Sequence, residues 1–263
     1  MASLSSTMLQ SAWSNKDATM PPFFDWLALI LFISSWIAYT RYASIEGKRR
    51  HSLSSIMHHF RIDWMRRLLR RENRVADMSA VGNLERNSAF FASACLFAVG
   101  GLITVLAASE QVMALLNDIS FVQDGTKAMW EAKVGMLIIV YIYAFLSFTW
   151  SMRQFGFLSV MIGSAPTPTE SIDDGVKNTF ALHTAEVMDL AGKQFNLGLR
   201  AFYFSLAVVG WFIGPFWFVA GTAVIIAVLY RREFRSNTLK KLIRARGLDP
   251  NQPIQSADED STA

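Results

Sequence analysis

Residues 195–234 read FNLGLRAFYFSLAVVGWFIGPFWFVAGTAVIIAVLYRREF, and the way this stretch folds decides the architecture of the whole chain. No charged side chain occurs between Ala201 and Tyr230. An α-helix rises about 1.5 Å per residue and needs about 20 apolar residues to cross about 30 Å of hydrocarbon. The stretch is therefore too long for one upright crossing, and it predicts insertion into a membrane.

Helix-breaking residues interrupt this stretch at its middle. Gly210, Gly214 and Pro215 favour a turn there, with tryptophans of the kind that gather at membrane–water boundaries on both sides of it. We therefore predict a tight hairpin of two spans, over residues 195–213 and 216–232. The alternative is one tilted and kinked span.

The composition also indicates a membrane protein. Of the 263 residues, 52% are hydrophobic and only 17% are charged, and the apolar residues cluster in long runs. The net charge of +4 comes from Lys and Arg that flank these runs, as in cytoplasmic membrane loops, so no nucleic-acid partner is predicted. The single cysteine, Cys95, excludes an internal disulfide and a cysteine metal site.

The other apolar runs complete an all-α, polytopic membrane protein with about five spans and amphipathic cytoplasmic helices. The five predicted spans cover residues 23–40, 88–108, 134–152, 195–213 and 216–232. The predicted organisation is a disordered amino-terminal tail, a helical membrane domain and a disordered acidic tail, over residues 1–22, 23–248 and 249–263 respectively.

The basic residues predict the orientation. Five spans put the basic loop between Arg41 and Arg86, the segment 154–194 and the basic end from Arg231 to Arg246 all on the cytoplasmic side. Four spans leave that basic end outside, against the positive-inside rule. We therefore expect five spans, with the amino terminus outside and the carboxyl terminus in the cytoplasm, and keep four as the alternative.

An amphipathic helix is predicted within the basic loop after the first span. Its apolar residues form one stripe at helical spacing, and arginines lie largely opposite. We expect this helix to lie in the membrane interface through Phe60, Arg61, Trp64, Arg66 and Arg70. Packing against another cytoplasmic helix of the same protein explains the pattern equally well.

A second amphipathic helix is predicted to begin near Asp174 and to lead into the hairpin at Phe195. His183 and Leu190 fall on its apolar stripe, so we expect both side chains to pack against other helices.

The chain resembles the family catalogued as domain of unknown function 599, which occurs in bacterial and plant membrane proteins, over nearly its whole length. The residues that carry the resemblance are His58-His59-Phe60-Arg61, Trp64-Met65, Arg71-Glu72, Arg74, Asp77, Phe90-Phe91-Ala92-Ser93, Glu131, Lys133, Phe148-Thr149-Trp150, Arg153-Gln154, Phe195-Asn196, Gly198, Arg200, Tyr203, Arg231-Arg232-Glu233-Phe234 and Ser236. The resemblance implies a small multi-pass protein of a bacterial inner membrane and brings no reaction, substrate or cofactor.

Sequence motifs give no support for catalysis or metal binding. His58 and His59 point about 100° apart on a helix, and His51 lies about two turns from His58, so these side chains cannot share a metal ion. No glycine-rich phosphate loop followed by Lys and no serine elbow occurs. We predict no catalytic residue, no metal and no cofactor.

Arginines gather at the predicted cytoplasmic boundary, and their planar forks suit phosphates and carboxylates. We predict a site for a lipid headgroup or a cytoplasmic anion on this rim, formed by Arg153, Gln154, Asn196, Arg200 and Arg232. The alternative is the ordinary arginine collar that orients inner-membrane proteins.

Two functions are compatible with these features of the sequence. The first is a non-enzymatic membrane protein that binds anionic headgroups through its basic cytoplasmic face, with a second copy or another membrane protein as a further partner. The second is a small passive channel or carrier. The span interiors carry no Asp, Glu or His, which disfavours a proton- or sodium-coupled carrier, whereas the interrupted hairpin keeps passive transport open.

Overall fold

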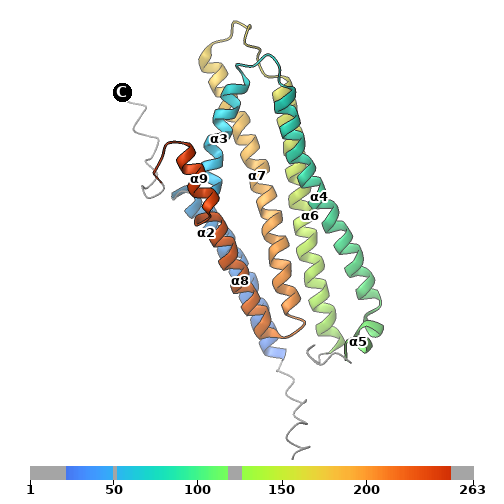
Figure 1. Ribbon diagram of the computed structural model, residues 1–263. Helices are drawn as coiled ribbons and strands as arrows, with labels where there is room; N and C mark the ends of the chain where they lie inside the picture. Colours follow the sequence, from blue (N-terminus) through green and yellow to red (C-terminus); the bar gives the residue numbers. More distant parts are fainter. Residues whose placement is uncertain (1–21, 50–51, 118–125, 250–263) are drawn as a thin grey trace, which may run out of the picture.

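The computed structural model describes residues 22–49, 52–117 and 126–249, and every regular element in these ranges is an α-helix (Figure 1). The all-α prediction is confirmed. Both predicted disordered tails lie almost entirely outside the described residues.

The described helices begin and end as follows: α2 Pro22–Arg49, α3 Leu53–Leu68, α4 Val75–Ala107, α5 Ser109–Asn117, α6 Lys127–Gly163, α7 Asp174–Gly210, α8 Pro215–Phe234 and α9 Asn237–Ala245.

The long helices lie side by side in one bundle (Figure 1). We call the end where α2, α6 and α8 begin the lower end, and the end where α4 and α7 begin the upper end. Helices α6 and α7 each contain 37 residues, or about 55 Å at about 1.5 Å per residue. They are longer than the hydrocarbon of a bilayer is thick, and their upper parts continue past α2 and α8 to pack with α3.

The predicted turn between two antiparallel helices is confirmed, and its first helix, α7, is continuous from Asp174. Helix α7 ends at Gly210 and α8 begins at Pro215, and the two helices run in opposite directions. Pro215 occupies the first turn of α8, where its missing N–H costs no hydrogen bond. A Cβ at Gly210 would lie only 3.0 Å from the Trp217 carbonyl oxygen, so this close approach of the two helices favours glycine. The alternative of one kinked helix is excluded.

Four helical segments are long and apolar enough to cross a membrane: Phe23–Gly47, Val75–Ala107, Lys127–Gly163 and Pro215–Ala245. Helix α7 is not among them, and its uncharged part covers only residues 201–210. It packs most extensively against α6 and next against α8.

The apolar stripe of α3 is buried inside the protein. Met65 and Leu68 are 1% exposed and join Leu158 of α6 and Ala185 of α7 in one core cluster near the upper end. Helix α9 covers the beginning of α3, where Ile243 packs on Ile56. Helix α3 therefore packs on other helices of the same protein, which is one of the two readings that the sequence left open.

Candidate functional site

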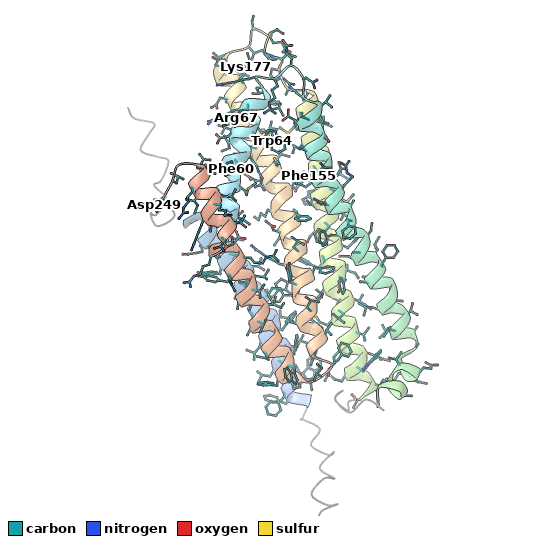
Figure 2. All side chains as sticks on the ribbon, in the orientation of Figure 1. Phe60, Trp64, Arg67, Phe155, Lys177 and Asp249 are labelled. Atoms are coloured by element: carbon teal, nitrogen blue, oxygen red, sulfur yellow. The ribbon has the colours of Figure 1, made fainter. Side chains whose placement is uncertain are left out.

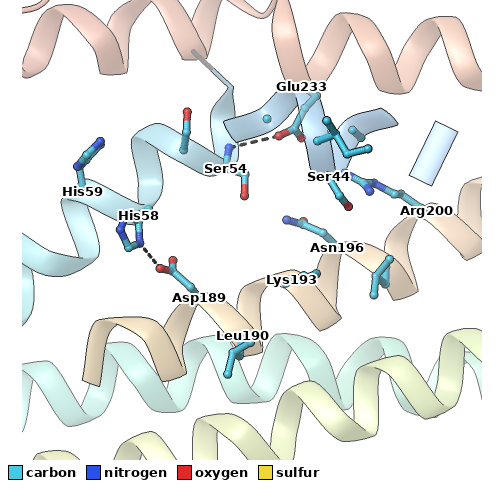
Figure 3. Close-up of a pocket in the computed structure, with 15 residues that line it drawn as sticks. Ser44, Ser54, His58, His59, Asp189, Leu190, Lys193, Asn196, Arg200 and Glu233 are labelled. Atoms are coloured by element: carbon cyan, nitrogen blue, oxygen red, sulfur yellow. Dashed lines mark hydrogen bonds and ion pairs between the residues drawn. The ribbon is translucent and has the colours of Figure 1, made fainter. Parts of the chain in front are cut away.

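A cavity of about 760 Å³ lies where the end of α2, the beginning of α3, the middle of α7 and the end of α8 meet (Figure 3). Its volume is within the range of about 300–1,000 Å³ that is usual for small-molecule sites. Its charged and amide-bearing lining residues are His58, His59, Asp189, Lys193, Asn196, Arg200 and Glu233. The cavity therefore places charged and amide groups beside apolar side chains such as Ile45 and Leu197.

One wall of the cavity is a polar stripe on α7. Lys193, Asn196 and Arg200 are three and four residues apart, so they share one helix face, and Figure 3 shows them on the same side of α7. The guanidinium of Arg200 lies 5.6 Å from the centre of the Tyr39 ring of α2. Within the described ranges, neither Lys193 nor Arg200 forms an ion pair with a carboxylate. This wall therefore presents two cationic side chains to the cavity, with no carboxylate of the described residues at ion-pair distance from either.

The facing wall comes from α2, α3 and α8. The carboxylate of Glu233 accepts a hydrogen bond of 3.3 Å from the Ser54 backbone N–H in the first turn of α3 (Figure 3). Among the described residues Glu233 forms no ion pair. The hydroxyl of Ser44 bonds back to its own helix at the Thr40 carbonyl oxygen. This wall therefore offers a carboxylate and a hydroxyl.

The upper end of the cavity is closed by contacts between α3 and α7. Asp189 accepts hydrogen bonds from both His58 and Arg61, so its charge is already balanced (Figure 3). Burial lowers the pKa of the neighbouring His59 below its ordinary value, and the positive charge of Arg246 acts in the same direction. His59 is therefore neutral at neutral pH and adds no charge to the cavity.

The structure brings together two of the five residues predicted for the rim site. Asn196 and Arg200 line the cavity. Arg153 instead borders a separate hollow of about 860 Å³ on α6, with its guanidinium 5.5 Å from the Phe157 ring. Gln154 is buried, and Arg232 donates a hydrogen bond to the Tyr203 hydroxyl. The five residues do not form one cluster, because neither the α6 residues Arg153 and Gln154 nor Arg232 lines the cavity.

The five residues predicted for the interfacial helix mostly contact the protein itself. The Trp64 Nε1–H donates to the buried Asp77 at 2.7 Å, and Arg61 donates to Asp189. Arg66 donates to the Asn178 side chain at 3.0 Å, and Arg246 lies over the Phe60 ring. Arg70 is exposed. Figure 2 shows Phe60 and Trp64 on α3, beside the upper half of the bundle.

Sequence reasoning missed the cavity residue Lys193, since the predicted rim was built from arginines with their neighbouring amides. The signal was present, because residues 189, 193, 196 and 200 recur at the spacing of one helix face. The cavity itself is not visible in the sequence, because four separate segments of the chain form it.

A second buried polar group lies near the lower end of the bundle. The Trp211 Nε1–H donates to Asp25 at 2.6 Å, and Lys133 donates to the Trp211 backbone carbonyl at 2.9 Å, with 3.7 Å between the Lys133 Nζ and an Asp25 carboxylate oxygen. The charged side chains of Lys133 and Asp25 are only 7% and 4% exposed. The sequence predicted span interiors without Asp, Glu or His, yet Asp25, at the edge of the first predicted span, is enclosed by the bundle. Its partner Lys133 lies just before the third predicted span and is enclosed as well.

Long apolar helices joined by an antiparallel hairpin define this molecule as a multi-pass α-helical membrane protein. Residues 27–238 match the model of the family described as "Protein of unknown function, DUF599", and the chain belongs to this family. The resemblance found in the sequence is thereby confirmed. No curated protein and no solved structure matches the chain significantly.

Proposed function

We propose that this protein is a non-enzymatic component of the inner (cytoplasmic) membrane that binds a phosphate-bearing group in the cavity between α2, α3, α7 and α8. The observation that carries the proposal is the α7 wall, where Lys193, Asn196 and Arg200 line the cavity and the two cations have no carboxylate partner in the described structure. Ammonium and guanidinium groups form their strongest hydrogen bonds with phosphate and carboxylate oxygens.

The proposed orientation places the cavity at the cytoplasmic headgroup level. With α7 counted as a crossing beside α6 and α8, the chain has five spans and its carboxyl terminus is cytoplasmic. The exposed Arg41, Arg231 and Arg232 then lie at the inner boundary near the cavity, in agreement with the positive-inside rule. Paired reporters fused after Ala263, one active only in the cytoplasm and one only outside, test this orientation.

Packing below the cavity favours binding over conduction. Phe32 of α2, Phe204 of α7 and Phe218 of α8 are at most 1% exposed and pack together between the cavity and the lower end. Since these rings fill the space among the three helices, the cavity does not continue downward among them. Gradient-driven flux of ions or small solutes into liposomes above that of empty vesicles would contradict the binding proposal and support a channel or carrier.

Ligand-induced thermal stabilisation of the purified full-length protein tests the site. We expect a short-chain phospholipid to stabilise the protein, and the substitutions Lys193→Ala and Arg200→Ala each to weaken its binding by about tenfold, as expected for loss of one charge-assisted hydrogen bond. Inorganic phosphate as a second ligand separates a free anion from a lipid headgroup. The control Lys240→Ala removes an exposed cation on α9 outside the cavity lining. Unchanged binding by both cavity variants would contradict the proposal.

A further inference from the structure

The two walls of the cavity carry charges of opposite sign that face each other without pairing. Lys193 and Arg200 extend from α7, and Glu233 extends from the end of α8 on the other side (Figure 3). No ion pair joins these residues across the cavity in the described structure. The nearby carboxylate of Asp189 is already bound to His58 and Arg61, which leaves Glu233 as the acidic lining residue that is available to a ligand.

A ligand that carries a negative and a positive group a few atoms apart can pair with the cations of one wall and with the carboxylate of the other. A purely anionic ligand satisfies Lys193 and Arg200 but is repelled by Glu233, because like charges in a partly enclosed site disfavour each other. A zwitterion avoids this repulsion and forms charge-assisted hydrogen bonds at both ends.

We propose that the cavity selects an aminoalkyl phosphate headgroup, of the phosphoethanolamine type. Its phosphate oxygens accept hydrogen bonds from Lys193, Asn196 and Arg200, and its primary ammonium donates to the carboxylate of Glu233. A primary ammonium has three N–H donors, whereas a trimethylated ammonium has none, so the cavity distinguishes the two through Glu233. This inference rests on the proposed function, because it needs the same phosphate subsite.

The apolar part of the lining indicates that the headgroup belongs to a lipid. Ile45 of α2 and Leu190 and Leu197 of α7 border the same cavity, and Ile45 and Leu190 are 57% and 51% exposed. Exposed apolar side chains beside a polar subsite suit the glycerol and first methylene groups of an acyl chain. A water-soluble phosphoethanolamine gains nothing from these contacts and binds more weakly.

The test measures dissociation constants of short-chain lipids that share their acyl chains and differ in headgroup, with the full-length protein in detergent. The headgroups are phosphoethanolamine, its N-methyl, N,N-dimethyl and N,N,N-trimethyl derivatives, and phosphoglycerol. We expect affinity to fall with each added methyl group and to be at least about tenfold lower for the trimethyl lipid. This series uses the unaltered chain, so it does not depend on any variant folding.

The substitution Glu233→Gln tests whether Glu233 causes the preference for a primary ammonium over a trimethylated one. Its amide oxygen can still accept the Ser54 hydrogen bond, so we expect an unchanged unfolding midpoint, while the advantage of the primary ammonium over the trimethyl headgroup disappears. Equal binding of all the headgroups by the unaltered protein would overturn the aminoalkyl selectivity and leave the phosphate proposal standing. If Lys193→Ala and Arg200→Ala also leave lipid binding unchanged, both proposals fail. Soluble phosphoethanolamine binding as tightly as the lipid would overturn the lipid assignment.

Discussion

Arg61 of α3 donates a hydrogen bond to the carboxylate of Asp189 on α7, and this ion pair fixes the upper end of the cavity. The Asp189 carboxylate also accepts a hydrogen bond from His58, one turn earlier on α3. Helix α3 is therefore attached to α7 by charge as well as by its apolar stripe.

The substitution Asp189→Asn should loosen α3 from α7. Arg61 is 17% exposed at its side chain and would lose its charged partner, so we expect a loss of about 2 kcal/mol in the free energy of unfolding. Denaturant unfolding in detergent micelles measures it. The control is Glu186→Gln, since the contact of Glu186 with His183 is largely exposed at both side chains and should contribute little. Equal stability of Asp189→Asn and the unaltered protein would refute this role.

The substitution Gly198→Ala should separate α6 from α7. A Cβ at Gly198 would lie 2.8 Å from ring atoms of Phe148, which is fully buried and cannot move aside. Such overpacking costs about 1–3 kcal/mol. A matched control is Gly135→Ala in α6, because a Cβ there meets nothing within 4 Å, and its stability should stay equal or rise by about 0.5–1 kcal/mol. The thermal unfolding midpoint should fall for Gly198→Ala and stay equal or rise for Gly135→Ala, and an equal fall in both variants would be inconsistent with the packing described.

A double-mutant cycle on Asp25 and Lys133 should reveal strong coupling. Removing one partner leaves the other charge buried and uncompensated, which costs about 3–5 kcal/mol. We expect the single variants Asp25→Asn and Lys133→Met to be strongly destabilised, and the double variant to be less destabilised than the sum of the two. Free energies of unfolding in detergent measure the cycle. Additive effects would show that the two side chains do not depend on each other.

The sequence predicts the hairpin well because a few local residues determine it. Gly210 and Pro215 interrupt an apolar run at a point where no longer-range contact is needed to define a turn. The helix in the basic loop, α3, is also predictable from the sequence, since its apolar residues recur at helical spacing. The stripe does not predict whether lipid or protein covers it, because an apolar helix face is buried favourably against either.

The predicted packing of α7 was wrong at two residues. His183 and Leu190 were expected to be packed, yet both are exposed, and His183 contacts Glu186 at 2.9 Å. Small residues such as Ala181, Ala185 and Ala191 are buried in the core cluster that α7 shares with α3 and α6. Close helix packing favours small side chains, so the position of a large side chain such as Leu190 does not by itself mark the interface. The buried pair of Asp25 and Lys133 could not be predicted either, because it joins helices that are far apart in the sequence.

The stability of the protein should fall in mild acid through His59. Burial lowers the pKa of His59 below 6.5, Arg246 and His58 act in the same direction, and Asp63 and Asp189 oppose it. As the pH falls, His59 takes up a proton in the unfolded chain before it does so in the native protein. The stabilisation that neutral His59 contributes is therefore complete above the unfolded pKa and is lost as the pH falls toward the lower native pKa. Thermal midpoints between about pH 5 and about pH 8 should decline less steeply for His59→Gln. If the unaltered protein and His59→Gln lose stability equally as the pH falls, groups other than His59 cause the loss.

The location of bound lipid shows directly whether the cavity between α2, α3, α7 and α8 is the headgroup site. A phospholipid with a photoreactive diazirine beside its phosphate can be bound to the full-length protein, irradiated, and its attachment sites mapped by mass spectrometry of peptides. We expect attachment to the cavity walls, around residues 44–47 of α2, 54–59 of α3 and 189–200 of α7, and a loss of this attachment in Lys193→Ala and Arg200→Ala. Attachment confined to the outer face of α6 around Arg153, or attachment that both variants leave unchanged, would contradict it.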